Sequence, residues 1–390
     1  MEEKPIIKSV FLFKQKSKFC FFKKYMCVLF PDKIVLHKIK KNSKQKEIPI
    51  TGETEIRLLD SSKKEFSILQ KNRIYNFISN SAKVFENWIS QIKKQILYSK
   101  DININCFDII SFLGNGYYGD TYLFMRKHFQ NKYAVKVVSK EKSVANNINI
   151  VLTEKNILKN LNYPFIVKFK FSFQSENMYY LGLEYLSCGN LKTCINSLEN
   201  GLSMYDIKLI IAEVALALNY LHQNNIVYRD LKQENIMIDK NGYIKLIDFG
   251  LSISIKDKQL LTDFCGTPEY IAPEIINRMP YDYSIDLWQL GILTYTLIFG
   301  REPFQHTNLN RLYQIICNND IHFPPNTNSK TISFISGLLE KNPQKRFKIS
   351  DVMNHTFFDE FDFLKIEKKE VKLSFIPKEI GLNLKKGFTI

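Results

Sequence analysis

Two polar motifs restrict the fold of this chain more than any other sequence feature. The first is YRDLKQEN at residues 228–235, and the second is DFG at 248–250, with Asp248 thirteen residues after Asn235. Both lie between short apolar segments that are predicted strands. Carboxylate and amide oxygens are the ligands that Mg²⁺ prefers, so we expect Asn235 and Asp248 to hold two Mg²⁺ ions.

A glycine-rich segment lies upstream, with Gly114, Gly116 and Gly119 in the spacing G-x-G-x-x-G. Glycines let backbone N–H groups close over phosphate oxygens, although such spacing alone often marks only a turn. Seventeen residues later Lys136 ends the segment YAVK, and Glu154 falls in a predicted helix over 146–159, where it can pair with Lys136. A surface lysine and a surface glutamate are the alternative, which the motifs at 228–235 and 248–250 disfavour.

These motifs together fit phosphoryl transfer, which requires a held triphosphate, neutralised charge and a hydroxyl aimed in line. In this interpretation Asp230 accepts the proton of the hydroxyl, and Lys232 steadies the phosphoryl group in motion. A catalytically silent scaffold with the same fold is the rival interpretation. It is disfavoured because every ionisable position of the motifs is filled.

Further markers follow in order: GTPEY at 266–270, APE at 272–274, Asp286 in D-x-W-x-x-G, and Arg346. With them, residues 107–358 resemble the protein-kinase superfamily. The resemblance implies an α+β, bilobal fold with a β-rich small lobe and an α-rich large lobe, and it implies ATP with two Mg²⁺ ions. It also implies a buried Glu274–Arg346 ion pair and a bracing role for Asp286 beneath the loop at 228–235.

The same resemblance implies the nucleotide-binding residues, with Leu183 as gatekeeper and 184–186 as the hinge. Thr121 stands where the family usually has Val, so the roof over the adenine is slightly more polar. The set is Leu113, Gly114, Asn115, Gly116, Gly119, Thr121, Ala134, Lys136, Glu154, Glu184, Leu186 and Met237.

The closer resemblance is to the AGC group of kinases, which phosphorylate Ser and Thr. It rests on Tyr228 in place of the usual His, and on the segments TEKNIL at 153–158, YPFIV at 163–167 and FCGTPEY at 264–270. The group's phosphorylated activation-loop threonine is replaced here by Asp263. We expect Asp263 to pair with Arg229 and partly order the loop, the alternative being a solvated carboxylate. Thr262 is an alternative phosphosite, and Thr267 completes the predicted regulatory set.

Substrate selection departs from the AGC pattern as well. Asn190 and Thr296 replace two acidic positions that commonly receive substrate arginines, and only Glu234 of that set is kept. We therefore predict a weakened preference for basic substrates. The tail at 359–390 resembles the AGC extension but stops without its terminal hydrophobic motif, so we expect no regulation by tail docking into the small lobe.

Residues 4–98 form a separate predicted domain. Short β-branched and aromatic runs occupy 6–79, and then Phe85, Trp88, Ile92 and Ile96 recur with helical spacing. This pattern resembles a pleckstrin-homology domain, a small β-barrel capped by a C-terminal helix. That domain order resembles the protein kinase B family.

The first hundred residues hold a surplus of 13 of the net charge of +16. By resemblance, the predicted lipid-binding residues are Lys14, Lys16, Lys18, Lys23 and Lys24. An arginine that could grip phosphate bidentately is absent from this set. Specific phosphoinositide binding, general attraction to anionic lipid and protein binding therefore all stay open. Nucleic-acid binding is disfavoured, because no recognition helix or aromatic and basic platform accompanies the charge.

The seven cysteines are scattered without a C-x-x-C pair, which favours a reducing compartment. The longest apolar stretch, at 290–299, is too short and too polar to cross a bilayer, and no signal peptide is expected. We expect a cytoplasmic chain without a transmembrane segment, recruited to the inner face of the plasma membrane, that acts on protein substrates.

Overall fold

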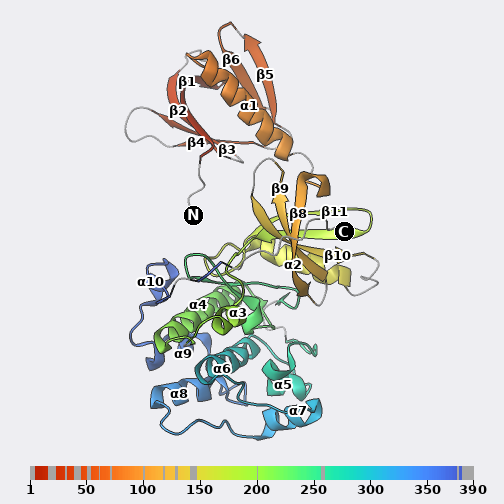
Figure 1. Ribbon diagram of the computed structural model, residues 1–390, viewed down its shortest axis with the longest axis vertical. Helices are drawn as coiled ribbons and strands as arrows, with labels where there is room; N and C mark the ends of the chain where they lie inside the picture. The colour runs from red at the N-terminus through yellow and green to blue at the C-terminus, as the bar shows by residue number, and fades with distance from the viewer. Residues whose placement is uncertain are drawn as a thin grey trace. The chain divides into compact units, whose positions relative to one another are not determined.

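The computed structural model divides the chain into two compact units, Met1–Ile104 and Asn105–Ile390, which are described separately below (Figure 1). The residues that the structure describes are 5–15, 23–30, 33–38, 45–50, 54–60, 62–70, 73–99, 102–116, 119–127, 131–140, 147–199, 201–255, 260–375 and 377–379.

The first unit contains one antiparallel sheet of seven strands, in the order β4-β3-β2-β1-β7-β6-β5. Within the described residues β4 and β5 are the two edges of this sheet, so the sheet of the predicted small β-barrel is not closed. The strands are β1 (Ile7–Gln15), β2 (Lys23–Leu29), β3 (Lys33–Lys38), β4 (Lys46–Pro49), β5 (Glu55–Asp60), β6 (Glu65–Gln70) and β7 (Arg73–Ile78).

Helix α1 (Ala82–Ser99) covers the core of this unit with the predicted stripe. Phe85, Trp88 and Ile92 are buried in the same cluster as Phe11, and the rings of Phe11 and Trp88 lie edge to face at 4.8 Å. The Ile96 side chain, also predicted for this stripe, lies outside the described residues. Burying aromatic rings of this size supplies much of the stability of a small unit.

The second unit begins with an antiparallel sheet in the order β11-β12-β10-β9-β8, beside which α2 lies (Figure 1). The predicted helix over 146–159 is confirmed as α2 within the described residues. These elements are β8 (Phe107–Gly116), β9 (Gly119–Arg126), β10 (Lys132–Ser139), α2 (Asn147–Asn160), β11 (Phe169–Gln174) and β12 (Met178–Glu184).

The remainder of this unit is mainly helical, which confirms the α+β class. Its helices are α3 (Leu191–Asn196), α4 (Met204–Gln223), α5 (Pro273–Ile276), α6 (Ser284–Phe299), α7 (Leu309–Asn318), α8 (Ser329–Leu338), α9 (Ile349–Met353) and α10 (Phe363–Glu367). Short two-stranded ribbons pair β13 (Ile226–Val227) with β16 (Ile253–Ser254), and β14 (Ile236–Ile238) with β15 (Ile244–Leu246). Single 3-10 turns are η1 (Ile104–Cys106), η2 (Gln233–Asn235), η3 (Pro268–Tyr270) and η4 (Thr356–Phe358).

Helix α4 starts after its N-cap Ser203, whose hydroxyl accepts from the Asp206 backbone N at 3.1 Å. Its apolar residues then pack against α6, and most residues of both helices are buried. This pair forms the rigid base on which the loops of the candidate site rest.

Residues 359–375 are part of the second unit and pack against its core. The Tyr163 hydroxyl donates to Glu367 at 2.8 Å, and the Ser374 backbone N donates to Asp206 at 2.6 Å. Among the helices of the described residues, none has the length and apolar character to cross a membrane.

Candidate active site

An ion-pair triad joins the sheet, α2 and the DFG segment in the second unit. Lys136 on β10 places Nζ 2.9 Å from Glu154 Oε2 and 2.9 Å from Asp248 Oδ1. The Phe249 backbone N donates to the other oxygen of Glu154 at 3.3 Å. The predicted Lys136–Glu154 pair is therefore present, and it is linked to the segment that carries Asp248.

The electrostatics of this triad favour the charged forms of Lys136 and Asp248, whereas burial raises the pKa of Glu154 against the opposing charge of Lys136. Burial opposes the charge on Lys136, but the Glu154 and Asp248 carboxylates outweigh it and hold the pKa of Lys136 above its ordinary value. Burial likewise acts to raise the pKa of Asp248, but Lys136 lowers it below its ordinary value. Lys136 therefore stays a cation and Asp248 an anion at neutral pH.

A second cluster surrounds Asp230. The Lys232 ammonium lies 2.9 Å from Asp230 Oδ2, the Thr267 hydroxyl donates to Oδ1 at 2.9 Å, and Asn235 Nδ2 donates to Oδ2 at 2.7 Å. Lys232 also donates to the Thr267 hydroxyl at 2.9 Å. The loop at 228–235 and the GTPEY segment thus meet at one carboxylate.

The backbone beside Asp230 is held in a strained conformation. Arg229 has φ +70° and Asp248 has φ +54°, in the left-handed region that costs a non-glycine residue about 1–3 kcal/mol. The buried Asp286 carboxylate accepts from the backbone N of Arg229 at 2.8 Å, and the Gln289 side chain donates to the Arg229 carbonyl at 3.0 Å. Asp286 therefore lies where its predicted bracing role requires.

The glycine hairpin lies across the sheet from Lys136. Gly114 on β8 pairs with Thr121 on β9, and Thr121 pairs with Lys136 on β10, so the three form one row. Asn115 donates to Asp120 across the hairpin at 2.9 Å. Gly116 and Gly119 close the hairpin, while residues 117–118 lie outside the described residues.

The other predicted nucleotide residues lie on elements near this row. Ala134 pairs with Leu183 between β10 and β12, and Met237 on β14 bridges to Asn190. Leu186 is buried, whereas Leu113 is exposed. Their contacts with an adenine stay predictions.

The hinge contains an interaction that the sequence analysis did not find. Lys245 Nζ lies 2.8 Å from the Glu184 carboxylate, which also accepts from the Lys168 backbone N at 2.8 Å. The Glu184 backbone N donates to the Lys168 carbonyl at 3.0 Å. The Glu184 carboxylate therefore anchors the hinge, through contacts that the sequence did not predict.

The predicted regulatory residues gather beside Asp230. Arg229 contacts Asp263, and Thr267 contacts Asp230, while Thr262 has an exposed side chain next to Asp263.

Farther away, Arg346 forms two hydrogen bonds with Glu274, at 2.6 and 2.9 Å, where both residues are buried. The ion pair predicted from the family resemblance is therefore present.

The predicted lipid residues belong to the first unit. Lys23 and Lys24 begin β2 and are exposed. Lys14 lies on β1, but its side chain is outside the described residues, as are Lys16 and Lys18 altogether.

The donor chemistry of the site fits Mg²⁺. Asn235 uses its Nδ2 for Asp230, so its amide oxygen is the donor that can face a cation, as can the carboxylate of Asp248. Among the described residues, no three or more His, Cys, Asp or Glu side chains gather as a self-contained metal site. Mg²⁺ commonly binds through one or two carboxylates together with phosphates and water, which this donor set matches.

Comparison with known proteins gives consistent matches to one family. The description "protein kinase domain" applies to the family model that matches residues 107–358. Serine/threonine-protein kinase sgk-1 of Caenorhabditis elegans is 38% identical over 286 residues, which cover 72% of this chain and 62% of that relative. The gad8 kinase of Schizosaccharomyces pombe is 35% identical over 317 residues, or 77% of this chain and 55% of the relative.

The RAC-beta serine/threonine-protein kinase of Rattus norvegicus is 34% identical over 284 residues, which cover 71% of this chain and 59% of the relative. The chain therefore spans less than two thirds of the length of these three curated relatives. The family match nevertheless covers most of the chain and includes both clusters described above. The chain belongs to the protein kinase domain family, and its relatives are kinases of the AGC group.

Proposed function

We propose that the chain is a serine/threonine protein kinase that transfers the γ-phosphoryl group of MgATP to protein hydroxyls. The observation that carries this proposal is the pair of linked clusters in one unit, Lys136 with Glu154 and Asp248, and Asp230 with Lys232. Relatives that are named as serine/threonine kinases support the choice of acceptor.

The residues divide the chemistry between them. Asp230 is the acceptor for the substrate proton, and the Asn235 amide and the Thr267 hydroxyl hold its carboxylate in place. Lys232 supplies a positive charge beside it, where negative charge on the phosphoryl group would develop. Lys136 is held cationic to meet the α- and β-phosphates.

Asp248 and Asn235 would hold two Mg²⁺ ions, which neutralise phosphate charge when they are bound. The backbone N–H groups of the glycine hairpin would cover the phosphates. Ala134, Leu186 and Met237 would enclose the adenine. In this arrangement most of the rate enhancement comes from positioning and electrostatics rather than covalent catalysis.

Transfer of labelled phosphate from ATP to Ser, Thr and Tyr peptides tests this proposal. We expect transfer to Ser and Thr peptides, and loss of at least roughly 100-fold in Asp230→Asn, which keeps the shape but removes the proton acceptor. Lys136→Met should lose transfer as well. Thermal unfolding of each variant controls for folding. Transfer that persists in Asp230→Asn, or is absent from the wild-type chain, would refute the proposal.

We also propose that the first unit binds anionic lipid and recruits the kinase from the cytoplasm to the inner face of the plasma membrane. Strand register supports this proposal, because several basic residues gather at one end of the sheet. This is the end at which β1 connects to β2 and β3 connects to β4, and its basic residues are Lys23, Lys38, Lys46 and Arg73. Burial and the nearby charge of Arg73 lower the pKa of Lys46. An anion bound at this end would relieve that repulsion.

Sedimentation with liposomes distinguishes the three alternatives for this unit. Binding to phosphatidylserine vesicles that is lost in high salt indicates general attraction, and binding that requires a phosphoinositide indicates a specific site. Lys24→Glu should weaken binding, whereas Lys83→Glu, at the start of α1 and beyond the opposite end of β7, should not. Absence of binding to every vesicle would favour a protein partner.

A further inference from the structure

A pocket of about 510 Å³ lies next to the proposed catalytic cluster in the second unit. Thr267 lines this pocket and also donates its hydroxyl to Asp230 at 2.9 Å. The pocket is therefore contiguous with the carboxylate that would accept the substrate proton. A peptide whose hydroxyl reaches Asp230 would place a neighbouring side chain in this pocket.

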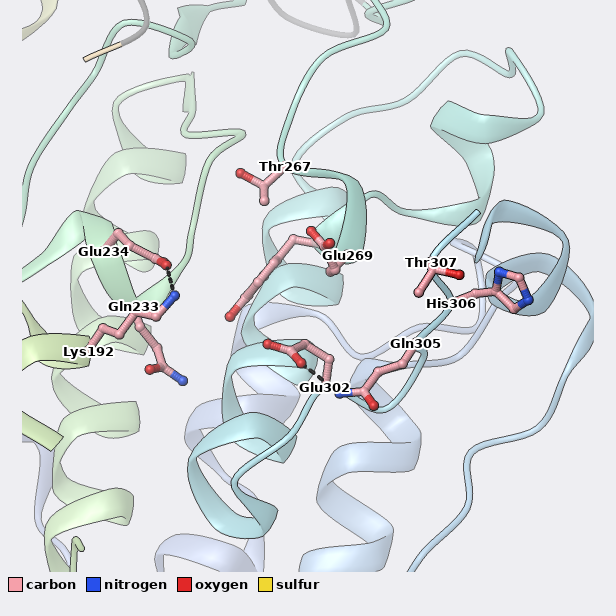
Figure 2. Close-up of a pocket in the computed structure, with 10 residues that line it drawn as sticks. Lys192, Gln233, Glu234, Thr267, Glu269, Glu302, Gln305, His306 and Thr307 are labelled. Atoms are coloured by element: carbon pink, nitrogen blue, oxygen red, sulfur yellow. Dashed lines mark hydrogen bonds and ion pairs between the residues drawn. The ribbon is translucent and has the colours of Figure 1, made fainter. Parts of the chain in front are cut away.

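Three carboxylates line the pocket, but they are not equivalent. Glu234, from the loop that carries Asp230, lies 2.7 Å from the Lys192 ammonium on α3. Glu302 accepts a hydrogen bond from the neutral Gln305 at 2.9 Å, and Glu269 is the third. Figure 2 shows Lys192 and Glu234 on one side of the pocket, across from His306 and Thr307. The carboxylate on the loop of the proposed base is thus the one with a cationic partner.

The ion pair keeps both of its members charged. The hydrogen bond and charge of Glu234 raise the pKa of Lys192. Burial acts to raise the pKa of Glu234, but Lys192 outweighs it and the pKa is lowered. An incoming cationic side chain therefore meets a Glu234 carboxylate that is already paired, with the like charge of Lys192 beside it.

Asn190 supports this interpretation from the start of α3. Its side-chain oxygen accepts from the Thr193 backbone N at 2.9 Å and so caps the helix that carries Lys192. The oxygen at this position serves the helix, and the helix fixes the backbone from which Lys192 extends toward Glu234.

We propose that Lys192 is a specificity-determining residue, which weakens selection for a substrate side chain with positive charge by occupying Glu234. This inference rests on the proposed kinase function. It gives a structural cause for the weakened preference for basic substrates. Glu269 and Glu302 keep the pocket acidic, so selection for a cation is reduced rather than reversed.

The test compares paired Ser peptides that differ by one Arg or Gln at each position within three residues of the acceptor. The measured quantity is the ratio of kcat/KM for the Arg peptide to that for the Gln peptide. In Lys192→Gln, we expect this ratio to rise about 2- to 5-fold at one position, which is the size of effect that the loss of one exposed charge typically has. Lys192→Glu should raise it further.

Lys330→Gln is the matched control, because Lys330 also forms an exposed ion pair, with Asp359. The side chains of Lys330 and Asp359 are 52% and 57% exposed. Those of Lys192 and Glu234 are 55% and 40% exposed. The ratio in Lys330→Gln should equal that of the wild type. An unchanged ratio in both Lys192 variants, with transfer intact, would overturn this inference and leave the kinase proposal standing. Absence of transfer by the wild-type chain to every peptide would overturn both.

Discussion

The guanidinium of Arg229 donates to the carboxylate of Asp263 at 3.0 Å, which ties the residue before Asp230 to the activation segment. The same guanidinium donates to the Leu251 carbonyl at 2.6 Å and to the Tyr281 hydroxyl at 3.2 Å. The Tyr281 hydroxyl in turn donates to the Asp263 carbonyl at 2.9 Å. The predicted pairing is thus present without a phosphate, and its regulatory effect stays a prediction.

Replacing Asp263 by Ala should lower kcat of the unphosphorylated chain by about 1.5- to 5-fold. The Asp263 side chain is 63% exposed, so its pairing with Arg229 gives only a modest constraint on the loop, worth about 0.2–1 kcal/mol as a surface pair, and the hydrogen bond from Tyr281 to the Asp263 backbone carbonyl is kept in the variant. Steady-state transfer to a Ser peptide measures the effect. Equal kcat in wild type and Asp263→Ala would remove the proposed role.

Two glycines of the hairpin should respond differently to Ala. A Cβ at Gly119 would lie 2.4 Å from the Val137 carbonyl oxygen, so the β9–β10 backbone must shift, whereas a Cβ at Gly114 meets nothing within 4 Å. We expect Gly119→Ala to lower the free energy of unfolding by about 1–3 kcal/mol, as overpacking does. Gly114→Ala should change it little. Thermal unfolding of both variants checks this, and equal melting temperatures would contradict it.

Local periodicity was sufficient to predict most strands and the buried face of α1, because Phe85, Trp88 and Ile92 repeat at helical spacing. Strand β4 carries a weaker local signal, since Pro49 lowers the expectation of a strand. The structure resolves this at the sheet edge, where Pro49 pairs with Lys33 on β3 and no further strand follows among the described residues. An edge position tolerates the absent N–H, and sequence alone does not reveal which strand is at the edge.

The ion pairs also divide into those that the sequence predicted and those that it did not. Motif spacing indicated the pair of Lys136 and Glu154, and the family resemblance implied the pair of Glu274 and Arg346. No motif marks Lys192 as the partner of Glu234 or Lys245 as the partner of Glu184, and tertiary packing brings these pairs together. A charge in a loop or strand gives no local signal of its partner, so these contacts required coordinates.

The buried pair of Glu274 and Arg346 should be important for stability. Replacing Arg346 by Met leaves Glu274 as an unpaired carboxylate that is only 2% exposed, which typically costs about 3–5 kcal/mol. Urea unfolding measures the loss. Adding Glu274→Gln to this variant removes the uncompensated charge and should restore part of it. A loss below about 1 kcal/mol in Arg346→Met would show that the pair contributes little.

Glu213 lies on α4, faces the apolar interior and is fully buried. One carboxylate oxygen accepts from the Ile244 backbone N at 2.9 Å, and the other has no hydrogen-bond partner among the described residues. Burial raises the pKa of Glu213 to about 8, against the opposing effects of the Ile244 hydrogen bond and the Lys369 charge, while Asp239 adds to the increase. The folded chain therefore holds this side chain neutral at pH 7 or below.

Glu213→Gln should make stability less dependent on pH. Between the ordinary pKa of 4.5 and the folded value of about 8, the folded chain keeps a proton that the unfolded chain has released. The free energy of unfolding of the wild type therefore falls as pH rises through this window. Gln keeps an acceptor for Ile244 without a charge, so its advantage over the wild type should grow by about 2–4 kcal/mol from pH 5 to pH 8. Urea unfolding at both pH values measures this growth, and the exposed Glu199→Gln should show none. A constant difference between wild type and Glu213→Gln would mean that Glu213 is already ionised in the folded chain at pH 5.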